Sequence, residues 1–144
     1  MRVLGLAVLL LAGGAFAAEA QSSCTCTTAA SDHAVKDLSR YKSAFAGKVV
    51  SVEPDGRVSF EVLRTWKGPR AKTLAVKAGP ENCRFPFETG KQYLVYANGE
   101  KDSLSTDRCA PMAELQNAAT QMRQLDLHTG QSAWLWAVVL GLAG

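Results

Sequence analysis

Four cysteines constrain this chain more than any other feature of its sequence. They are Cys24, Cys26, Cys83 and Cys109, and all of them follow an N-terminal segment with the pattern of a secretory signal. An even number of cysteines in a short exported chain indicates disulfide bonds, and four cysteines allow three pairings. A bond between Cys24 and Cys26 would close a very tight ring. Two pairings therefore remain open, and each ties the N-terminal segment to Cys83 and Cys109.

The first 20 residues predict a signal peptide. Arg2 supplies a positive charge, residues 3–12 form an apolar run, and small residues follow. Two small-x-small sites predict cleavage after Ala17 or after Ala20. An uncleaved anchor helix is the alternative, but the apolar run is short for a hydrocarbon core of about 30 Å. We therefore expect export to the periplasm, the extracellular space or the cell surface.

One domain is expected in the rest of the chain. A length of 144 residues fits a single domain. We place this domain at residues 21–127, between the signal peptide (1–20) and a C-terminal linker and tail (128–144). The net charge is +3 and does not change when the signal peptide is removed, because Arg2 and Glu19 cancel. So mild a charge predicts no nucleic-acid partner.

Alternation of apolar and polar residues predicts a mainly β domain. A hairpin is expected around the turn Glu53–Gly56, which contains Pro54 and Asp55. In the strand after this turn, one predicted face carries Val58, Phe60, Val62 and Trp66. In the fourth predicted strand, Tyr93 and Val95 face away from Leu94 and Tyr96. The five predicted strands cover residues 44–52, 57–66, 73–78, 92–97 and 103–108.

A short helix is expected near each end of the domain. Ser31 as an N-cap predicts a helix over residues 32–38. Pro111 suits the first turn of a second helix, whose packing face would carry Met112, Leu115, Ala119, Met122 and Leu125. Five short strands with terminal helices fit a small closed or partly open barrel.

The last 12 residues differ from the rest. Residues 133–144 are uniformly apolar and begin with Trp134 and Trp136. As a helix they would reach only about 18 Å, which is short of the hydrocarbon thickness. The two tryptophans suit a membrane interface, so we expect membrane contact through this tail. The alternatives are a processed sorting segment, the start of a longer spanning helix, or a tail packed on the barrel.

Catalytic and metal-binding motifs are missing from the sequence. The two histidines, His33 and His128, lie far apart along the chain, and the usual hydrolase, nucleotide and zinc patterns do not occur. We therefore expect no enzyme activity, no cofactor and no metal held by the protein itself. One stretch of the sequence is basic and contains Lys67, Arg70, Lys72 and Lys77. We interpret it as an ordinary solvent-exposed loop, in preference to an oligosaccharide or nucleic-acid site.

Several short motifs together resemble the inhibitory domain of the tissue inhibitors of metalloproteinases. That domain belongs to the netrin-like class of exported proteins, so the resemblance implies an OB-fold-type, five-stranded Greek-key barrel. It covers residues 24–125 and points to a prokaryotic relative. The motifs are Cys24-Thr25-Cys26, Phe45-Ala46-Gly47-Lys48-Val49, Trp66-Lys67-Gly68, Cys83-Arg84-Phe85, Tyr93-Leu94-Val95-Tyr96-Ala97 and Cys109.

The resemblance also implies a disulfide pairing and a mechanism. It pairs Cys24 with Cys83 and Cys26 with Cys109. In the family, the mature chain begins at the first cysteine of Cys-x-Cys, and its free amino group and carbonyl bind the catalytic zinc of the target protease. The next side chain, here Thr25, enters the specificity pocket. The protease contacts implied for this chain are Cys24, Thr25, Cys26, Cys83, Arg84 and Phe85.

The sequence departs from the family pattern at the N-terminal motif. Thr27 and Thr28 replace the apolar-Pro pair, and the third disulfide of the animal domain has no cysteines here. Cleavage after Ala20 would leave Gln21–Ser23 before Cys24, and a peptide bond at Cys24 removes the zinc-binding amine. We therefore expect an exported protein-binding domain without catalytic activity. The alternative is a metalloendopeptidase inhibitor that acts through Cys24-Thr25-Cys26 on a protease zinc.

Overall fold

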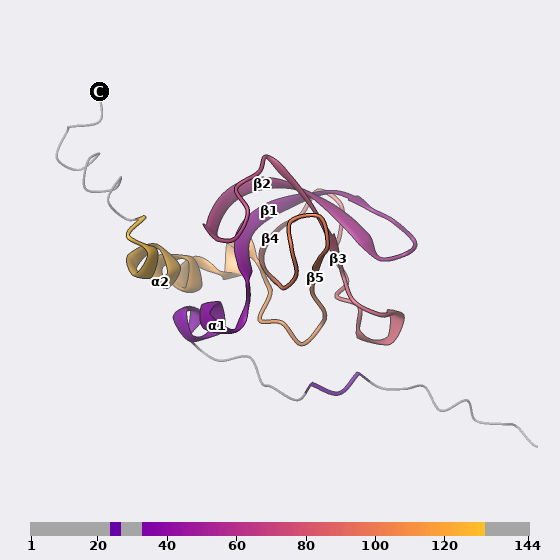
Figure 1. The fold of residues 1–144 in the computed structure, drawn as a ribbon, viewed down its shortest axis with the longest axis horizontal. Helices are drawn as coiled ribbons and strands as arrows, with labels where there is room; N and C mark the ends of the chain where they lie inside the picture. The colour runs from indigo at the N-terminus through magenta and orange to yellow at the C-terminus, as the bar shows by residue number, and fades with distance from the viewer. Residues whose placement is uncertain (1–23, 27–32, 132–144) are drawn as a thin grey trace, which may run out of the picture.

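The fold is a single curled β-sheet flanked by two helices (Figure 1). The computed structural model describes residues 24–26 and 33–131. Its sheet has six strands in the order β5-β3-β2-β1-β4-β6, where the sequence predicts five. The strands are β1 (Ser43–Val52), β2 (Arg57–Lys67), β3 (Thr73–Lys77), β4 (Gln92–Ala97), β5 (Leu104–Ser105) and β6 (Ala113–Glu114). The helices are α1 (Ala34–Arg40) and α2 (Ala119–Thr129), with short 3₁₀ turns η1 (Glu81–Cys83) and η2 (Leu115–Asn117).

The predicted hairpin is confirmed. β1 pairs antiparallel with β2, and the turn between them is closed by the Glu53 N–H, which donates to the Arg57 carbonyl at 2.8 Å. β2 continues antiparallel to β3, and β4 lies antiparallel on the other side of β1. These four strands match the predicted ranges closely because each apolar run lies between strong turn signals.

β5 links β3 to the segment that follows β4. β5 pairs in parallel with β3, with Leu104 opposite Val76. On its other side, Ser105 exchanges two backbone hydrogen bonds of 2.8 and 2.9 Å with Asn98, just beyond the end of β4. β5 is shorter than the predicted strand 103–108, because the chain turns at Asp107, whose carbonyl accepts the Ala110 N–H at 3.2 Å and whose side chain accepts the Cys109 N–H at 2.8 Å. The sheet is thereby curled into a barrel-like shape.

Two apolar clusters fill the fold, one on each side of the sheet. β4 is buried on both faces and supplies both clusters. Tyr93 and Val95 face away from Leu94 and Tyr96, as predicted. The inner cluster comprises Phe45, Val49, Val58, Phe60, Leu74, Val76, Ala78, Phe87, Tyr93, Val95, Ala97 and Leu104. The outer cluster lies between the sheet and the helices and comprises Ala34, Leu38, Ala44, Ala46, Trp66, Leu94, Tyr96, Ala110, Ala118 and Leu125.

The predicted position of Trp66 is wrong. Its side chain lies in the outer cluster, whereas Val58 and Phe60 lie in the inner one. β1 pairs Ala46 with Arg64 but the next residue, Gly47, with Val62, so β2 carries an extra residue between them. A second shift of the same kind follows before the end of β2. Such bulges break the strict alternation of a strand, and they redirect Trp66 to the helix side.

Polar contacts fix α2 against β2. The Trp66 indole N–H donates to Asp126 Oδ1 at 2.6 Å, and Arg64 forms an ion pair with the same oxygen at 2.7 Å. The Arg64 guanidinium also lies 5.4 Å from the centre of the Trp66 rings. Just beyond the helix, the Gln131 amide donates to the Thr65 carbonyl at 2.9 Å. On its other side α2 meets α1, where Gln124 accepts the Ala34 N–H at 3.0 Å (Figure 1).

The C-terminal helix begins later than predicted. Residues after Pro111 first form β6, in which Ala113 pairs with Leu94 of β4, and α2 begins only at Ala119. The free edge of β4 carries N–H and C=O groups that a neighbouring strand can pair with. Residues 113–114 pair with this edge as a strand, whereas a helix in their place would leave these β4 groups unpaired. Ala119 is exposed, and Ala118 occupies the buried position instead. The other predicted packing residues do contact the outer cluster: Met112, Leu115, Met122 and Leu125.

The described residues place only some of the predicted boundaries. α2 runs to Thr129, so His128 lies in its last turn and not in a linker. α1 begins at Ala34 with His33 at its N-cap position, so it starts and ends later than the helix predicted over residues 32–38 from Ser31. The predicted signal peptide (1–20) and the apolar tail (133–144) lie outside the described residues. Within the described part, no helix combines the length and the hydropathy needed to cross a membrane.

The turn that leads into β5 depends on Gly99. Its φ is +102°, and a Cβ built there would overlap the carbonyl oxygen of Ser103. Gly99→Ala is therefore expected to lower the free energy of unfolding by roughly 1–3 kcal/mol, as measured by urea denaturation. Gly90→Ala is the control, because Gly90 also has a positive φ but a Cβ there meets nothing within 4 Å. Equal losses in the two variants would contradict the overlap at Gly99.

Candidate functional site

Two disulfides anchor the N-terminal segment, which confirms the predicted disulfide bonding. Cys24 is bonded to Cys83, with Cα atoms 5.0 Å apart, and Cys26 is bonded to Cys109, with Cα atoms 5.4 Å apart. This is the pairing that the family resemblance implies. We call residues 24–26 the disulfide segment.

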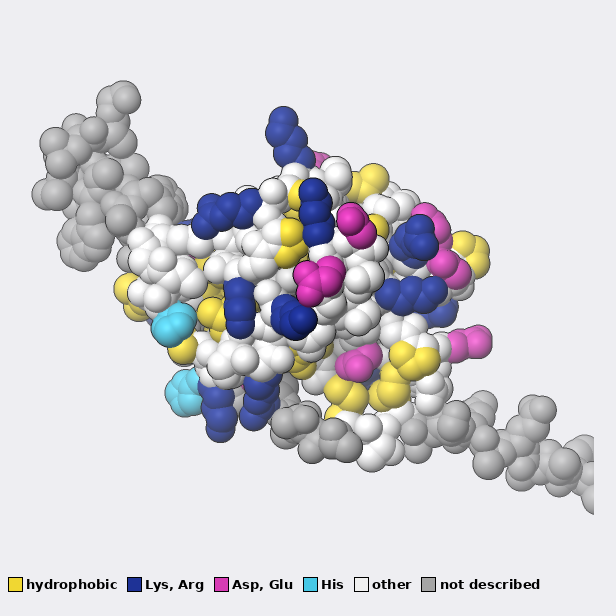
Figure 2. Space-filling view, viewed as in Figure 1, with side chains coloured by type: hydrophobic (Ala, Val, Ile, Leu, Met, Phe, Trp, Pro, Cys, Tyr) yellow, Lys and Arg dark blue, Asp and Glu magenta, His cyan; other side chains and the backbone are white. Residues whose placement is uncertain are grey.

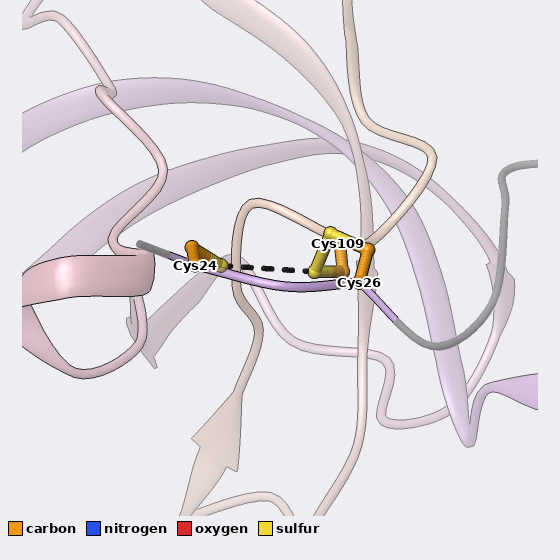
Figure 3. A group of neighbouring side chains, drawn as sticks. All are labelled: Cys24, Cys26 and Cys109. Carbon is orange, nitrogen blue, oxygen red and sulfur yellow. Dashed lines mark hydrogen bonds between the residues drawn. A yellow bond between two sulfur atoms is a disulfide. The ribbon is translucent and has the colours of Figure 1, made fainter. Parts of the chain in front are cut away.

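The sulfur atoms of the two disulfides lie close together. Cys24 Sγ lies 3.8 Å from Cys109 Sγ, beside the bond between Cys109 and Cys26 (Figure 3). Cys24, Cys26 and Cys109 are the only group of metal-binding side chains among the described residues with ligand atoms this near one another, within 4.8 Å. Each of these sulfurs is bonded to a second sulfur and carries no proton. The 3.8 Å contact is therefore van der Waals packing, and the oxidised site offers no thiolate to a metal.

The partners of the disulfide segment are themselves fixed by hydrogen bonds. The Cys83 N–H donates to the Pro80 carbonyl at 2.9 Å, and the Cys83 carbonyl accepts the Arg108 N–H at 2.8 Å. The Cys109 N–H donates to Asp107 Oδ1 at 2.8 Å. The loop before β4 and the loop after β5 are thus joined directly. The disulfide segment is therefore bonded to two loops that are themselves held in place by hydrogen bonds.

Thr25 is the exposed residue at the centre of this arrangement. It stands between two cysteines that are each bonded to a different loop, and its side chain is exposed. Because both neighbouring residues are fixed by disulfides, such a residue loses little further conformational freedom when another protein binds to it. The arrangement therefore presents one small side chain in a fixed position.

A polar pocket of about 330 Å³ opens beside Thr25. We call it the Thr25 pocket. Cys83 and Cys109 form part of its wall, and Tyr41 and Asp107 contribute the groups that ionise. Burial raises the pKa of the Tyr41 phenol, and the negative charges of Asp107 and Asp37 raise this pKa further. The positive charge of Arg40 acts in the opposite direction on this pKa.

Two of the predicted protease contacts point to other parts of the fold. The Arg84 guanidinium donates to the Pro54 carbonyl at 3.2 Å and packs on Gly56, at the tip of the hairpin between β1 and β2. Phe85 packs on the inner cluster, 4.6 Å from Phe87 and 5.8 Å from Tyr93 between ring centres. Of the three predicted contacts outside Cys24-Thr25-Cys26, namely Cys83, Arg84 and Phe85, only Cys83 is bonded to the disulfide segment.

The basic residues named in the sequence do not gather into one patch. Lys67, the last residue of β2, donates to the Leu38 carbonyl of α1 at 3.0 Å. Lys77, the last residue of β3, forms an ion pair of 3.5 Å with Asp55 in the turn between β1 and β2. On the face shown in Figure 2, basic and acidic side chains are interspersed. His33 and His128 are both exposed.

Sequence reasoning missed the Thr25 pocket. Tyr41 follows α1, whereas Asp107 follows β5, and no local pattern links the two segments. One local signal was available, because an Asp two residues before Cys109 favours the turn in which its side chain accepts the Cys109 N–H. No protein-family model matches this chain, and a search of curated proteins finds no match.

Proposed function

We propose that this chain is an exported, non-catalytic domain that binds another protein through the disulfide segment. The observation that carries the proposal is the exposed Thr25 between two cysteines bonded to separate loops. Ordering a binding loop costs free energy, and a loop that is already fixed avoids most of this cost. Two disulfides also favour an oxidising compartment, in agreement with the predicted signal peptide.

We propose further that the barrel is of the OB type and netrin-like. The main pairings run β1-β2-β3-β5, and the bridge from Ser105 to Asn98 leads to β4, which pairs with β1. This ring of five, with β3 and β5 parallel, supports the OB-type barrel. The sixth strand, β6, adds to the outer edge of β4. The barrel then serves as a rigid base for the disulfide segment at one end.

Crosslinking from Thr25 tests the protein-binding proposal. A photoreactive amino acid at position 25 of the full chain, expressed in its natural host, is expected to crosslink to one major protein. The same amino acid at Glu61, an exposed position in the middle of β2, is the control. Equal crosslinking from both positions, or none from position 25, would overturn the proposal. Thr25→Arg should then weaken binding of the purified partner at least about tenfold, a change of about 1.4 kcal/mol.

A metalloendopeptidase inhibitor is the second candidate. The observed pairing of Cys24 with Cys83 and Cys26 with Cys109 favours it, because this pairing is the one that the family resemblance implies. In that mechanism the free amine and carbonyl of Cys24 bind the protease zinc, and Thr25 enters the specificity pocket. The mechanism requires a mature chain that begins at Cys24.

The mature N-terminus separates the two candidates. We expect mass spectrometry of the exported protein to show a chain that begins at Gln21, which would exclude zinc binding by the Cys24 amine. Two refolded preparations, one beginning at Cys24 and one at Gln21, are then assayed against a zinc metalloendopeptidase. The inhibitor mechanism requires inhibition by the first and none by the second. Absence of inhibition by both would contradict it.

A further inference from the structure

We infer that the Thr25 pocket is a subsite for a cationic side chain, Lys or Arg, of the protein bound at the disulfide segment. The inference rests on the proposed function and goes beyond it by naming the chemistry that this pocket recognises. It starts from position: Thr25, Cys83 and Cys109 form part of the pocket wall. A partner chain that touches the Thr25 side chain therefore has the pocket within the reach of its next residues.

The charge of the Thr25 pocket favours a cation. Asp107 is half-buried in its wall, and among the described residues no Lys, Arg or His lines the pocket. Burial is the main cause of the raised pKa of Tyr41; the Asp107 and Asp37 charges add to it, and the Arg40 charge opposes them. Opposite charges attract more strongly in such a half-buried setting than in bulk water. An anionic group would instead meet the Asp107 carboxylate.

Part of the hydrogen-bonding capacity of the Thr25 pocket is also unused. Asp107 Oδ1 accepts the Cys109 N–H at 2.8 Å, and within the described part of the chain Asp107 Oδ2 has no partner. The same is true of the Tyr41 and Ser105 hydroxyl groups, which line the pocket. The Asp107 carboxylate only accepts hydrogen bonds, and the Tyr41 and Ser105 oxygens can accept them as well, whereas Lys and Arg carry several N–H donors and no acceptor. An apolar side chain would leave these oxygens without partners, at a cost in free energy.

The size of the Thr25 pocket suits one long side chain. A volume of about 330 Å³ is at the lower limit of small-molecule sites, roughly 300–1,000 Å³. The pocket is open to solvent beside an exposed residue, so the flexible stem of Lys or Arg can enter while the rest of the partner stays on the surface. The same volume leaves no room for a large cofactor.

A titration with a small probe tests this inference without the partner. The probe is Nα-acetyl-arginine amide, and its uncharged analogue Nα-acetyl-citrulline amide is the matched control. NMR amide shifts of the full mature chain are expected to move at Thr25, Ser105 and Asp107 with the arginine probe and not with the citrulline probe. The variant Asp107→Asn keeps an oxygen for the Cys109 N–H and removes the charge. It should weaken binding of the arginine probe about tenfold.

Two controls separate the subsite from other effects. Glu61→Gln removes one negative charge from an exposed position on β2, and it should leave the affinity for the arginine probe unchanged. The fold of Asp107→Asn is checked by its amide spectrum and by its two disulfides. Equal binding of both probes, or an equal loss in Glu61→Gln and Asp107→Asn, overturns the cation subsite. Crosslinking from position 25 is independent of this result, so failure of the subsite and failure of the protein-binding function are distinguishable.

Discussion

Removal of the longer disulfide, by the double substitution Cys26→Ser and Cys109→Ser, is expected to lower the free energy of unfolding by about 4 kcal/mol. The bond joins residues 83 positions apart, and in the chain-entropy model a loop of this length contributes that much by restricting the unfolded chain. The domain is small, and its total stability is expected in the range of about 5–15 kcal/mol. Urea denaturation under non-reducing conditions measures the loss.

The shorter disulfide supplies the matched comparison. Cys24→Ser with Cys83→Ser opens a bond across 59 positions, and the expected loss is again about 4 kcal/mol, because loop entropy grows only slowly with length. Removing both bonds should cost less than the sum. When one bond closes, it already brings the other pair nearer in the unfolded chain. Unchanged stability in both double variants would contradict a stabilising role for these bonds.

Trp66→Ala is expected to cost about 3–5 kcal/mol of unfolding free energy. Only 6% of the Trp66 residue is exposed, and it packs among residues from the sheet and both helices. The substitution leaves a cavity in the outer cluster and removes the indole N–H that donates to Asp126. The Asp126 carboxylate then keeps its ion pair with Arg64. Because this contact fixes α2 on β2, we also expect earlier loss of helical circular dichroism in urea.

Two substitutions calibrate the Trp66 result. Trp66→Phe keeps most of the ring packing and removes the N–H, so its loss should be about 1.5–3 kcal/mol, the usual scale of a hydrogen bond to a charged group. Leu63→Ala changes an apolar residue on the same strand that is 47% exposed, and its expected effect is below about 0.5 kcal/mol. A similar small loss for Trp66→Ala and Leu63→Ala would mean that Trp66 is not part of the core.

The strands could be predicted from local sequence because their signals are local. Alternation and turn residues define β1 to β4, and the two-sided apolar pattern of β4 predicts its burial on both faces. Alternation along β2 places Trp66 on the wrong face, because this rule assumes that neither strand of a pair carries an extra residue relative to its partner. The bulges in β2 arise from its pairing with β1, and nothing in the sequence of β2 alone marks them.

The remaining errors have the same non-local origin. The apolar spacing from Met112 onward is compatible with a helix, but the free edge of β4 takes Ala113 and Glu114 as a strand. The residues alone left two cysteine pairings open, because pairing depends on which loops the fold brings together. Tyr41 and Asp107 meet in the Thr25 pocket for the same reason. Sequence reasoning found the disulfide segment and missed the pocket beside it.

The positions of the four cysteines impose an order of events on the newly made chain. A ribosome makes Cys24 and Cys26 first, and their partners follow 59 and 83 residues later. Neither native bond can close until most of the barrel has emerged. Until then the two early thiols are free to react with each other or with a foreign thiol. A dedicated thiol–disulfide isomerase in the compartment where the chain folds would therefore shorten its maturation.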